Sequence, residues 1–168
     1  MKTLFINRHA KSSWKNHSLR DFDRPLNKRG KINAPFMAER FAQNETIDFI
    51  ISSPAERAKK TAMAFQEACA ISEEQFRFEQ DIYMASVSEI LRIVNSIPDK
   101  YNSVMLFGHN PTFSELAWYF DHNFNDHLVT CARVKVEFDL DRWSLIGKNL
   151  GRVVDHDYPR KYKEMENL

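Results

Sequence analysis

An arginine and a histidine stand side by side just after a short apolar run near the start of the sequence. The run is Leu4-Phe5-Ile6, and Arg8-His9 follows it closely. An unbroken apolar run of this kind is typical of a strand that is covered on both faces. In open α/β sheets, ligands bind at the carboxyl ends of the strands. The pair therefore lies where a functional site is expected, although the dipeptide by itself is not a specific signal.

Two later segments repeat this pattern of a buried run, polar residues and a helix. In "IDFIISSPAERAKK" the run is followed by Ser53-Pro54 and then Arg57, and in "SVMLFGHNPTF" it is followed by His109 and Pro111. The carboxyl ends of parallel strands share one edge of a sheet, so we expect the three junctions to meet there. The side chains brought together would be those of Arg8, His9, Arg57 and His109. The first turns of the two helices would add free backbone N–H groups and a positive dipole end.

Such a cluster indicates a pocket for a compact dianion, and phosphate is the obvious candidate because arginine binds it with two hydrogen bonds. A neutral imidazole in a phosphate pocket can attack phosphorus and form a covalent phosphohistidine, which water then hydrolyses. The sequence contains no glycine-rich phosphate loop, no carboxylate cluster suited to magnesium and no Cys/His spacing typical of a metal site. We therefore expect a reaction that uses neither a metal ion nor a cofactor.

The motifs at these junctions resemble those of the histidine phosphatase (phosphoglycerate mutase-like) superfamily, and in particular its small SixA-type phosphohistidine phosphatases. The matching segments are "RHAKS" at 8–12, "SPAER" at 53–57, "GHNP" at 108–111 and a "DxxRPLxxxG" pattern from Asp21 to Gly30. Trp143 followed by Pro159 is also similar to the C-terminal part of that subgroup. The motifs occur in the expected order, and together they are specific.

The resemblance implies a role for each residue of the cluster. His9 corresponds to the nucleophile of the family. Arg8 and Arg57 correspond to its phosphate-binding arginines, and His109 to its second histidine. Ser12 is a further candidate for phosphate binding, and it belongs to the same first motif.

The sequence departs from the family pattern where a proton donor would be expected. Mutase-type members carry a glutamate in a recognisable segment, whereas Glu79 and Asp81 lie in the corresponding region, "FEQDIYMAS", without a matching motif. Both are candidate acid donors, and both are also explained as ordinary exposed carboxylates. Expelling an alkoxide needs a general acid, while a nitrogen-linked phosphoryl group has a better leaving group. A site without a strong acid favours phosphohistidine or another activated phosphate over sugar phosphates as the substrate.

The chain alternates between strand and helix patterns. Apolar runs predict strands at residues 3–8, 47–51, 76–78, 104–107 and 132–138, and helical spacing predicts helices that begin near residues 32, 54, 87 and 111. The last strand alternates apolar with charged residues, which is typical of a position at or near a sheet edge. The sequence predicts one α/β domain over residues 1–168. We expect it to have three layers (α/β/α), a mostly parallel sheet with one antiparallel edge strand and, as the resemblance implies, a phosphoglycerate mutase-like fold.

A polar segment, residues 12–30, is longer than most loops, and its length suggests a functional role. Asp21 and Arg24 within it are expected to hold the segment in place rather than to perform chemistry. Pro25 is expected to stiffen it.

The composition is that of an ordinary globular protein with no general attraction for polyanions. The 168 residues include 24 Lys or Arg and 23 Asp or Glu, which gives a formal net charge of +1. This balance argues against nucleic acid or a membrane as a partner. The two cysteines, Cys69 and Cys131, have no motif partner and are expected to be reduced thiols. Because no signal segment or membrane-spanning run is visible, the sequence predicts a cytoplasmic protein.

The leading hypothesis is a metal-independent phosphatase that forms a covalent phosphohistidine at His9 and dephosphorylates phosphohistidine on a protein, with a place in signal transduction. The short chain has no long insertion that could close over a small molecule, and a protein substrate needs an open site. One alternative is a phosphomonoesterase or mutase that acts on small phosphorylated metabolites. Another is a non-catalytic phosphate-binding module, whose mark would be the loss of His9 or His109, and both are present.

Overall fold

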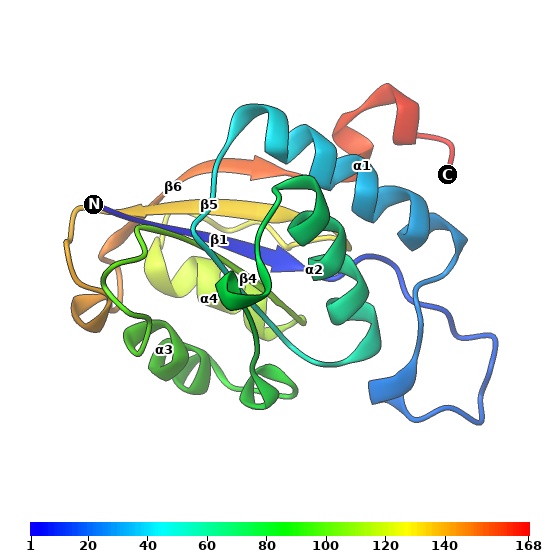
Figure 1. Ribbon diagram of the computed structural model, residues 1–168, viewed down its shortest axis with the longest axis horizontal. Coiled ribbons are helices and arrows are strands. Elements are labelled where there is room, and N and C mark those ends of the chain that lie inside the picture. The colour runs from blue at the N-terminus through cyan, green and yellow to red at the C-terminus, as the bar shows by residue number, and fades with distance from the viewer.

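A six-stranded sheet forms the centre of the computed structural model, which describes residues 1–168 (Figure 1). The strands are β1 (Lys2–Arg8), β2 (Phe49–Ser52), β3 (Phe76–Phe78), β4 (Ser103–Gly108), β5 (Arg133–Phe138) and β6 (Gly151–Asp157). Their order across the sheet is β3-β2-β4-β1-β5-β6. The first four strands pair in parallel, whereas β5 is antiparallel to β1 and to β6. The predicted α/β fold with a mostly parallel sheet is confirmed.

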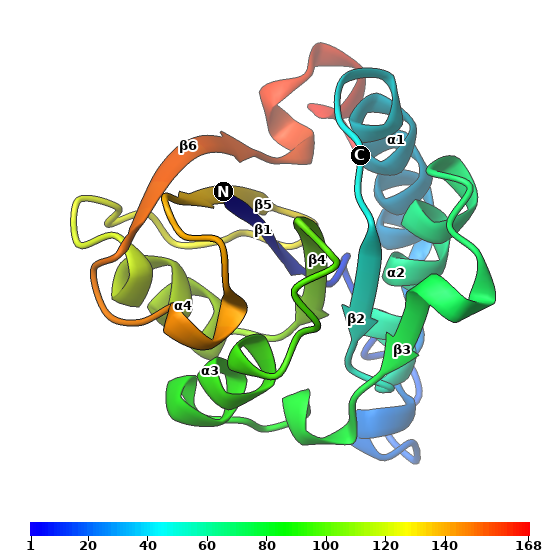
Figure 2. The same cartoon turned by 60° about the vertical axis from the view of Figure 1, so that its left-hand side comes forward.

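Helices cover both faces of this sheet. They are α1 (Lys28–Asn44), α2 (Glu56–Ala68), α3 (Val87–Asn95) and α4 (Thr112–Phe120). Figure 2 shows α1 and α2 on one side of the strands and α3 and α4 on the other. Alternate residues of β1 explain the two layers, since Leu4 and Ile6 pack with residues of α3 and α4, and Phe5 packs with residues of α1 and α2. No helix combines the length and the apolar character that a membrane crossing requires.

Strand β6 has no counterpart among the sequence predictions. It lies at the edge of the sheet, so β5 is a next-to-edge strand rather than the edge itself. Only Asp157 among the seven residues of β6 is buried, and a strand with so little burial carries no apolar pattern to detect. The alternation in β5 is nevertheless real, because Lys135 and Glu137 are more exposed than Val134 and Val136.

The long segment before α1 is folded back on itself. Ser13 donates its backbone N–H to the carbonyl of Pro25, and Asn27 donates to the carbonyl of Lys11. Asn27 then caps α1, because its side chain accepts a hydrogen bond from the N–H of Gly30 at 2.8 Å. Gly30 lies against the Lys11 carbonyl, and a Cβ at this position would overlap that oxygen. The absence of a side chain at Gly30 thus allows the first turn of α1 to pack against the backbone of Lys11.

We expect Gly30→Ala to destabilise the protein by about 2 kcal/mol. Backbone atoms cannot move aside cheaply, and this overlap outweighs the better helix propensity of alanine. Gly147→Ala is a matched control, because the nearest atom to its added Cβ would be Leu150 Cδ1 at 3.8 Å. Urea unfolding of both variants measures the difference, and equal stability of the two would contradict the argument.

Candidate active site

Three strands end at one place in the sheet and carry the predicted cluster with them. His9 donates its backbone N–H to the carbonyl of Gly108 at 3.1 Å, and Ser53 donates to that of Phe107 at 2.9 Å. These bonds continue the pairing of β1 with β4 and of β2 with β4 beyond the strand ends. As a result the imidazole rings of His9 and His109 lie with centroids 5.3 Å apart. Arg8, His9, Arg57 and His109 do meet at the carboxyl edge of the sheet.

One hydrogen bond fixes the tautomer of His9. Its Nδ1 lies 2.7 Å from the carbonyl oxygen of Ala10, which can only accept, so Nδ1 carries the proton. The Nε2 atom therefore bears the lone pair, and the Nε–H of Arg57 donates to it at 3.3 Å. The side chain of His9 is buried. The ring is held with an unprotonated nitrogen facing a guanidinium group.

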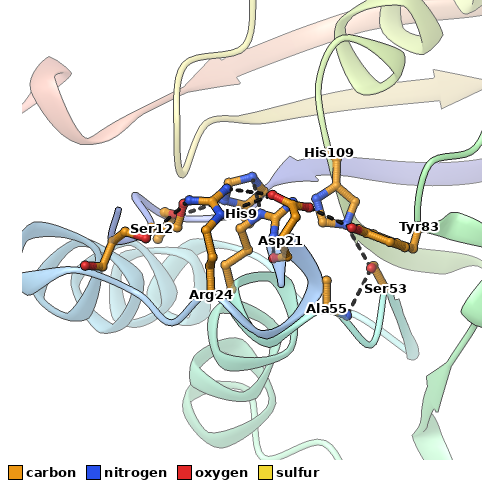
Figure 3. Close-up of polar contacts among 11 residues, drawn as sticks. His9, Ser12, Asp21, Arg24, Ser53, Ala55, Tyr83 and His109 are labelled. Carbon is orange, nitrogen blue, oxygen red and sulfur yellow. Dashed lines mark hydrogen bonds and ion pairs between the residues drawn. The ribbon is translucent and has the colours of Figure 1, made fainter. Parts of the chain in front are cut away.

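The remaining hydrogen bonds of Arg57 go to Asp21, in the segment that precedes α1. Nη1 of Arg57 donates to the Asp21 carbonyl at 2.7 Å, and Nη2 donates to Asp21 Oδ2 at 3.0 Å. The same carboxylate accepts hydrogen bonds from Arg24 Nε at 3.1 Å and from the Tyr83 hydroxyl at 2.7 Å. Figure 3 shows Asp21 between Arg24 and Tyr83, close to both histidines. Asp21 does hold its segment in place, and it does so by contacts inside the site.

The second histidine is oriented by a serine of the β2–α2 junction. His109 Nε2 lies 2.8 Å from Ser53 Oγ, and this oxygen also accepts a hydrogen bond from the N–H of Ala55 (Figure 3). If the serine hydroxyl donates to Nε2, Nδ1 of His109 carries the proton, and Nδ1 is buried without a hydrogen-bond partner. An N–H donor is thus available beside His9. Helix α2 begins at Glu56, so Pro54 precedes it rather than occupying its first position.

Arg8 is anchored from the opposite side of the site. Its Nη1 donates to the carbonyl of Leu128 at 2.9 Å, and Asn110 Nδ2 donates to the same oxygen at 2.8 Å. Nε of Arg8 is buried and has no partner. Burial lowers the pKa of Arg8, and the charge of Arg57 lowers it further, yet the guanidinium group remains a cation at neutral pH. Two arginine charges therefore flank the His9 imidazole.

The electrostatic environment keeps both imidazoles neutral. Burial lowers the pKa of His9 well below 6.5; the hydrogen bond to the Ala10 carbonyl opposes this shift, and the charges of Arg57 and Arg8 add to it. Burial, followed by the charge of Arg57, lowers the pKa of His109 to about 4. Asp21 stays ionised, because hydrogen bonds from Tyr83 and Arg57 overcome its partial burial and lower its pKa to about 2. A neutral His9 with a free lone pair is the form that can act as a nucleophile.

A cleft of about 340 Å³ opens in front of these groups. It is lined by Asp21, Arg57, Ile82, Tyr83, Met84, Ala85, His109, Asn110, Pro111 and Thr112. The edge of the Tyr83 ring packs against the His109 ring, with centroids 5.6 Å apart. His9 does not line the cleft itself and contacts it through Arg57. The lining also includes the apolar or aromatic residues Ile82, Tyr83, Met84, Ala85 and Pro111.

Besides Arg8 and His9, three further candidates from the sequence do not line this cleft. The Ser12 hydroxyl is buried and accepts a hydrogen bond from Arg24 Nη1 at 2.7 Å. Glu79 faces Arg77, with Oε2 at 3.9 Å from Nε, and Asp81 is exposed in a short 3-10 turn. The residue of this region that reaches the site is Tyr83, which sequence reasoning missed. No local pattern marks it, because its hydroxyl partner lies 62 positions away along the chain.

Comparison with known proteins finds a family match over part of the chain. Residues 4–81 match the histidine phosphatase superfamily (branch 1), and this range contains both the Arg8-His9 pair and Arg57. The matched range is less than half of the 168 residues, and it shows a similarity to this superfamily. The match ends at residue 81, before the junction of β4 with α4 that carries His109. The assignment of His109 to the site therefore rests on the distance between its ring and that of His9.

Two relatives of this chain are uncharacterised proteins. A chloroplastic protein of Arabidopsis thaliana is 30% identical over 125 residues, which make up 69% of this chain and 57% of the relative. A protein of Mycobacterium tuberculosis is 31% identical over 112 residues, or 66% of each chain. This chain thus spans less than two thirds of the length of either relative.

Solved structures of histidine phosphatases share the whole fold. A protein assigned as the phosphohistidine phosphatase SixA of Agrobacterium tumefaciens has a TM-score of 0.78 at 26% identity, over 94% of this chain and 98% of its own. The protein histidine phosphatase SixA in complex with tungstate has a TM-score of 0.80 at 18% identity, over 95% and 98%. A mycobacterial glucosyl-3-phosphoglycerate phosphatase has a TM-score of 0.68 at 13% identity, over 92% and 97%. The last two likenesses show the fold alone.

We expect the stability of the protein to fall as the pH is lowered from 7 to 5. An unfolded histidine titrates near pH 6.5, whereas the pKa of His109 in the folded protein is about 4. Between these values the unfolded state binds more protons, so acid favours unfolding. The loss from His109 alone is roughly 2 kcal/mol over this range. Urea unfolding at the two pH values measures it.

The variant His109→Asn isolates this contribution, because asparagine does not titrate in this range. It should lose roughly 2 kcal/mol less than the wild type between pH 7 and 5. The exposed His17 offers a control, and His17→Asn should behave as the wild type does. An acid sensitivity that is the same in all three proteins would show that His109 is not the group responsible.

Proposed function

We propose that the protein is a phosphatase in which His9 accepts the phosphoryl group of the substrate and forms a covalent phosphohistidine. The observation that carries this proposal is the hydrogen bond from His9 Nδ1 to the Ala10 carbonyl, which leaves a lone pair on Nε2 between two arginines. The match of residues 4–81 to the histidine phosphatase superfamily supports phosphatase activity in general. The match of the first motif to the family pattern supports His9 as its nucleophile.

The proposed reaction has two steps. In the first, the bond between His9 Nε2 and phosphorus forms while the bond to the leaving group breaks, and the leaving group keeps the electron pair. Arg8, Arg57 and the Nδ1–H of His109 stabilise the charge on the equatorial oxygens. In the second, water attacks phosphorus and gives up a proton to the solvent, the bond between phosphorus and Nε2 breaks, Nε2 regains its lone pair, and phosphate is released. Arg57 must give up its hydrogen bond to Nε2 when the phosphoryl group approaches.

The leaving group decides the proposed substrate, which is phosphohistidine on a protein. Asp21 is the one carboxylate that lines the cleft, and its low pKa and its three donors make it a poor proton donor. An imidazole leaves without the strong acid that an alkoxide requires. The apolar wall formed by Ile82, Tyr83 and Pro111 also suits a flat ring. A cytoplasmic site of action and a role in signal transduction are part of this proposal.

A second candidate function is the hydrolysis of small phosphorylated metabolites. The fold shared with a glucosyl-3-phosphoglycerate phosphatase favours it, and the cleft is large enough for a small ester. It would require a proton donor, for which Glu79 and Asp81 remain the proposed candidates. A non-catalytic phosphate-binding module is less well supported, because His9 and His109 are both in place.

We expect phosphate from a radiolabelled phosphohistidine protein to become attached to the enzyme within a single turnover. The label should be lost in acid and stable in base, as a phosphoramidate is. His9→Ala should abolish it and lower turnover by at least about 10³-fold, because the nucleophile itself is removed. His17→Ala, which removes an exposed histidine outside the site, should retain full labelling. Equal turnover by His9→Ala and the wild type would rule out His9 as the nucleophile.

A substrate panel separates the two candidate functions. We expect kcat/KM for 1-phosphoimidazole to exceed that for glucose 6-phosphate by about 10²-fold or more, because general acid catalysis is worth that much to an ester. Glu79→Gln and Asp81→Asn should leave the turnover of 1-phosphoimidazole unchanged. Ester turnover that is high and collapses in either variant would instead favour the metabolite phosphatase.

A further inference from the structure

The segment that borders the active site carries an unusual excess of positive charge. Residues 11–31 contain seven Lys or Arg and two Asp, although the whole chain is nearly balanced at 24 to 23. Both aspartates are already paired, Asp21 with Arg24 and Arg57, and Asp23 with Arg20. Figure 1 shows the first part of this segment as the dark blue loop that projects beyond the carboxyl end of β1. The excess therefore lies beside the catalytic cleft.

Five cations of this segment, Lys11, Lys15, Lys28, Arg29 and Lys31, have no carboxylate partner. We call the first four of them the basic rim. None of the four takes part in any of the ion pairs of the structure. Lys15 and Lys28 are exposed, and Lys11 and Arg29 are half-buried. The positive charge of the rim is thus not neutralised by carboxylates of the protein itself.

Two residues of the rim, Lys28 and Arg29, lie at the start of helix α1, where the helix dipole disfavours positive charge. The other three helices each have a glutamate in the first turn, where the positive end of the helix dipole favours an anion. Helix α1 has no acidic residue there and begins with Lys28-Arg29. Helix stability does not explain this choice, so a role outside the helix is indicated.

Next to the rim lies a small pocket, which we call the side pocket, of about 220 Å³. It is lined by Arg29, Asn33, Val129, Thr130, Tyr158, Pro159, Arg160 and Met165, and none of these is a carboxylate. Asn33 is 4% exposed, and its Oδ1 is buried without a hydrogen-bond partner. The unpartnered Oδ1 of Asn33 shares the lining of this pocket with Arg29 and Arg160, and it is a polar atom that a bound ligand would satisfy.

The side pocket is joined to the catalytic site by a short stretch of chain. Val129 and Thr130 line the pocket, and the carbonyl of the preceding Leu128 holds Arg8 and Asn110. Cys131 then donates its backbone N–H to the carbonyl of His9 at 3.0 Å. A substrate chain with one segment bound in the side pocket would therefore need only a few more residues to place its phosphorylated side chain at His9.

We propose that the basic rim and the side pocket together bind an acidic segment of the phosphorylated protein substrate. The proposal rests on the proposed function, and it adds where the substrate protein docks. A glutamate side chain fits the side pocket, because Val129, Pro159 and Met165 contact its methylene groups while the two arginines bind its carboxylate. Asn33 Oδ1 accepts a backbone N–H of the same segment. The mixed apolar and cationic lining favours a peptide over a nucleic acid backbone.

The test compares two phosphohistidine peptides of equal length, one flanked by glutamates and one by lysines, with 1-phosphoimidazole as a substrate too small to reach the rim. We expect a roughly ten- to hundredfold higher kcat/KM for the acidic peptide at low ionic strength. The preference should shrink near 1 M salt, where screening acts over about 3 Å. Turnover of 1-phosphoimidazole should depend little on salt.

The variant Lys15→Glu, Lys28→Glu, Arg29→Glu should remove or reverse this preference and leave 1-phosphoimidazole turnover unchanged. It should not unfold, because acids at the start of α1 suit the helix dipole, and its melting temperature should be equal to or above that of the wild type. The matched control is Lys100→Glu, Arg142→Glu, Lys148→Glu, three exposed cations without ion pairs at the other end of the sheet. This control should retain the preference. Arg160→Ala should weaken turnover of the acidic peptide alone.

The outcomes distinguish the two proposals. If both peptides are hydrolysed at equal rates that the rim variant does not alter, the docking surface is wrong and the proposed function stands. If 1-phosphoimidazole is hydrolysed and neither peptide is, the protein substrate is wrong and the docking surface falls with it. Single-stranded DNA that inhibits the reaction at a lower concentration than a glutamate polymer of equal charge would overturn the assignment of the rim to protein.

Discussion

The parallel pairing of β1 with β4 and of β4 with β2 is the constraint on which the rest of the site depends. The registers Arg8 with Gly108 and Ser52 with Phe107 bring three strand ends to one level. The next residue after each strand is polar, so the pairing itself assembles the cluster. His9 and Ser53 extend the pairing with backbone hydrogen bonds to β4. A slip of one residue in either pairing would turn these side chains to the opposite face.

This assembly has an electrostatic cost that the surrounding groups reduce. Two guanidinium groups and two imidazoles share a buried edge, and the imidazoles respond by remaining neutral, as their lowered pKa values show. Asp21 supplies the one nearby negative charge and contacts both Arg24 and Arg57. The polar segment before α1 is thus part of the site, because it supplies the counter-charge without which Arg57 would be buried beside Arg8 unpaired.

The features that the sequence revealed are those set by local pattern. Apolar runs followed by polar residues marked β1, β2 and β4, and through them Arg8, His9, Arg57 and His109. The features that it did not reveal depend on contacts between distant segments. Nothing near Tyr83 indicates that its hydroxyl meets Asp21, and the exposed strand β6 carries too little apolar periodicity to be detected. Residue type indicated Glu79 and Asp81 as proton donors, whereas the residue of this region that the fold directs into the cleft is Tyr83.

Asp21 also bears on how a phosphoryl group would compete for Arg57 under the proposed mechanism. Its carboxylate and its carbonyl hold Nη2 and Nη1 of Arg57, so the fork of the guanidinium group is already engaged, and Nε–H is the donor that faces His9. A substrate that approaches Nε2 therefore displaces a single N–H rather than a bidentate pair, and the hydrogen bonds from Arg57 to Asp21 need not break. The same arrangement binds product phosphate less tightly than an unoccupied fork would. A site that must release phosphate in every cycle gains from an arginine whose strongest hydrogen bonds stay with the protein.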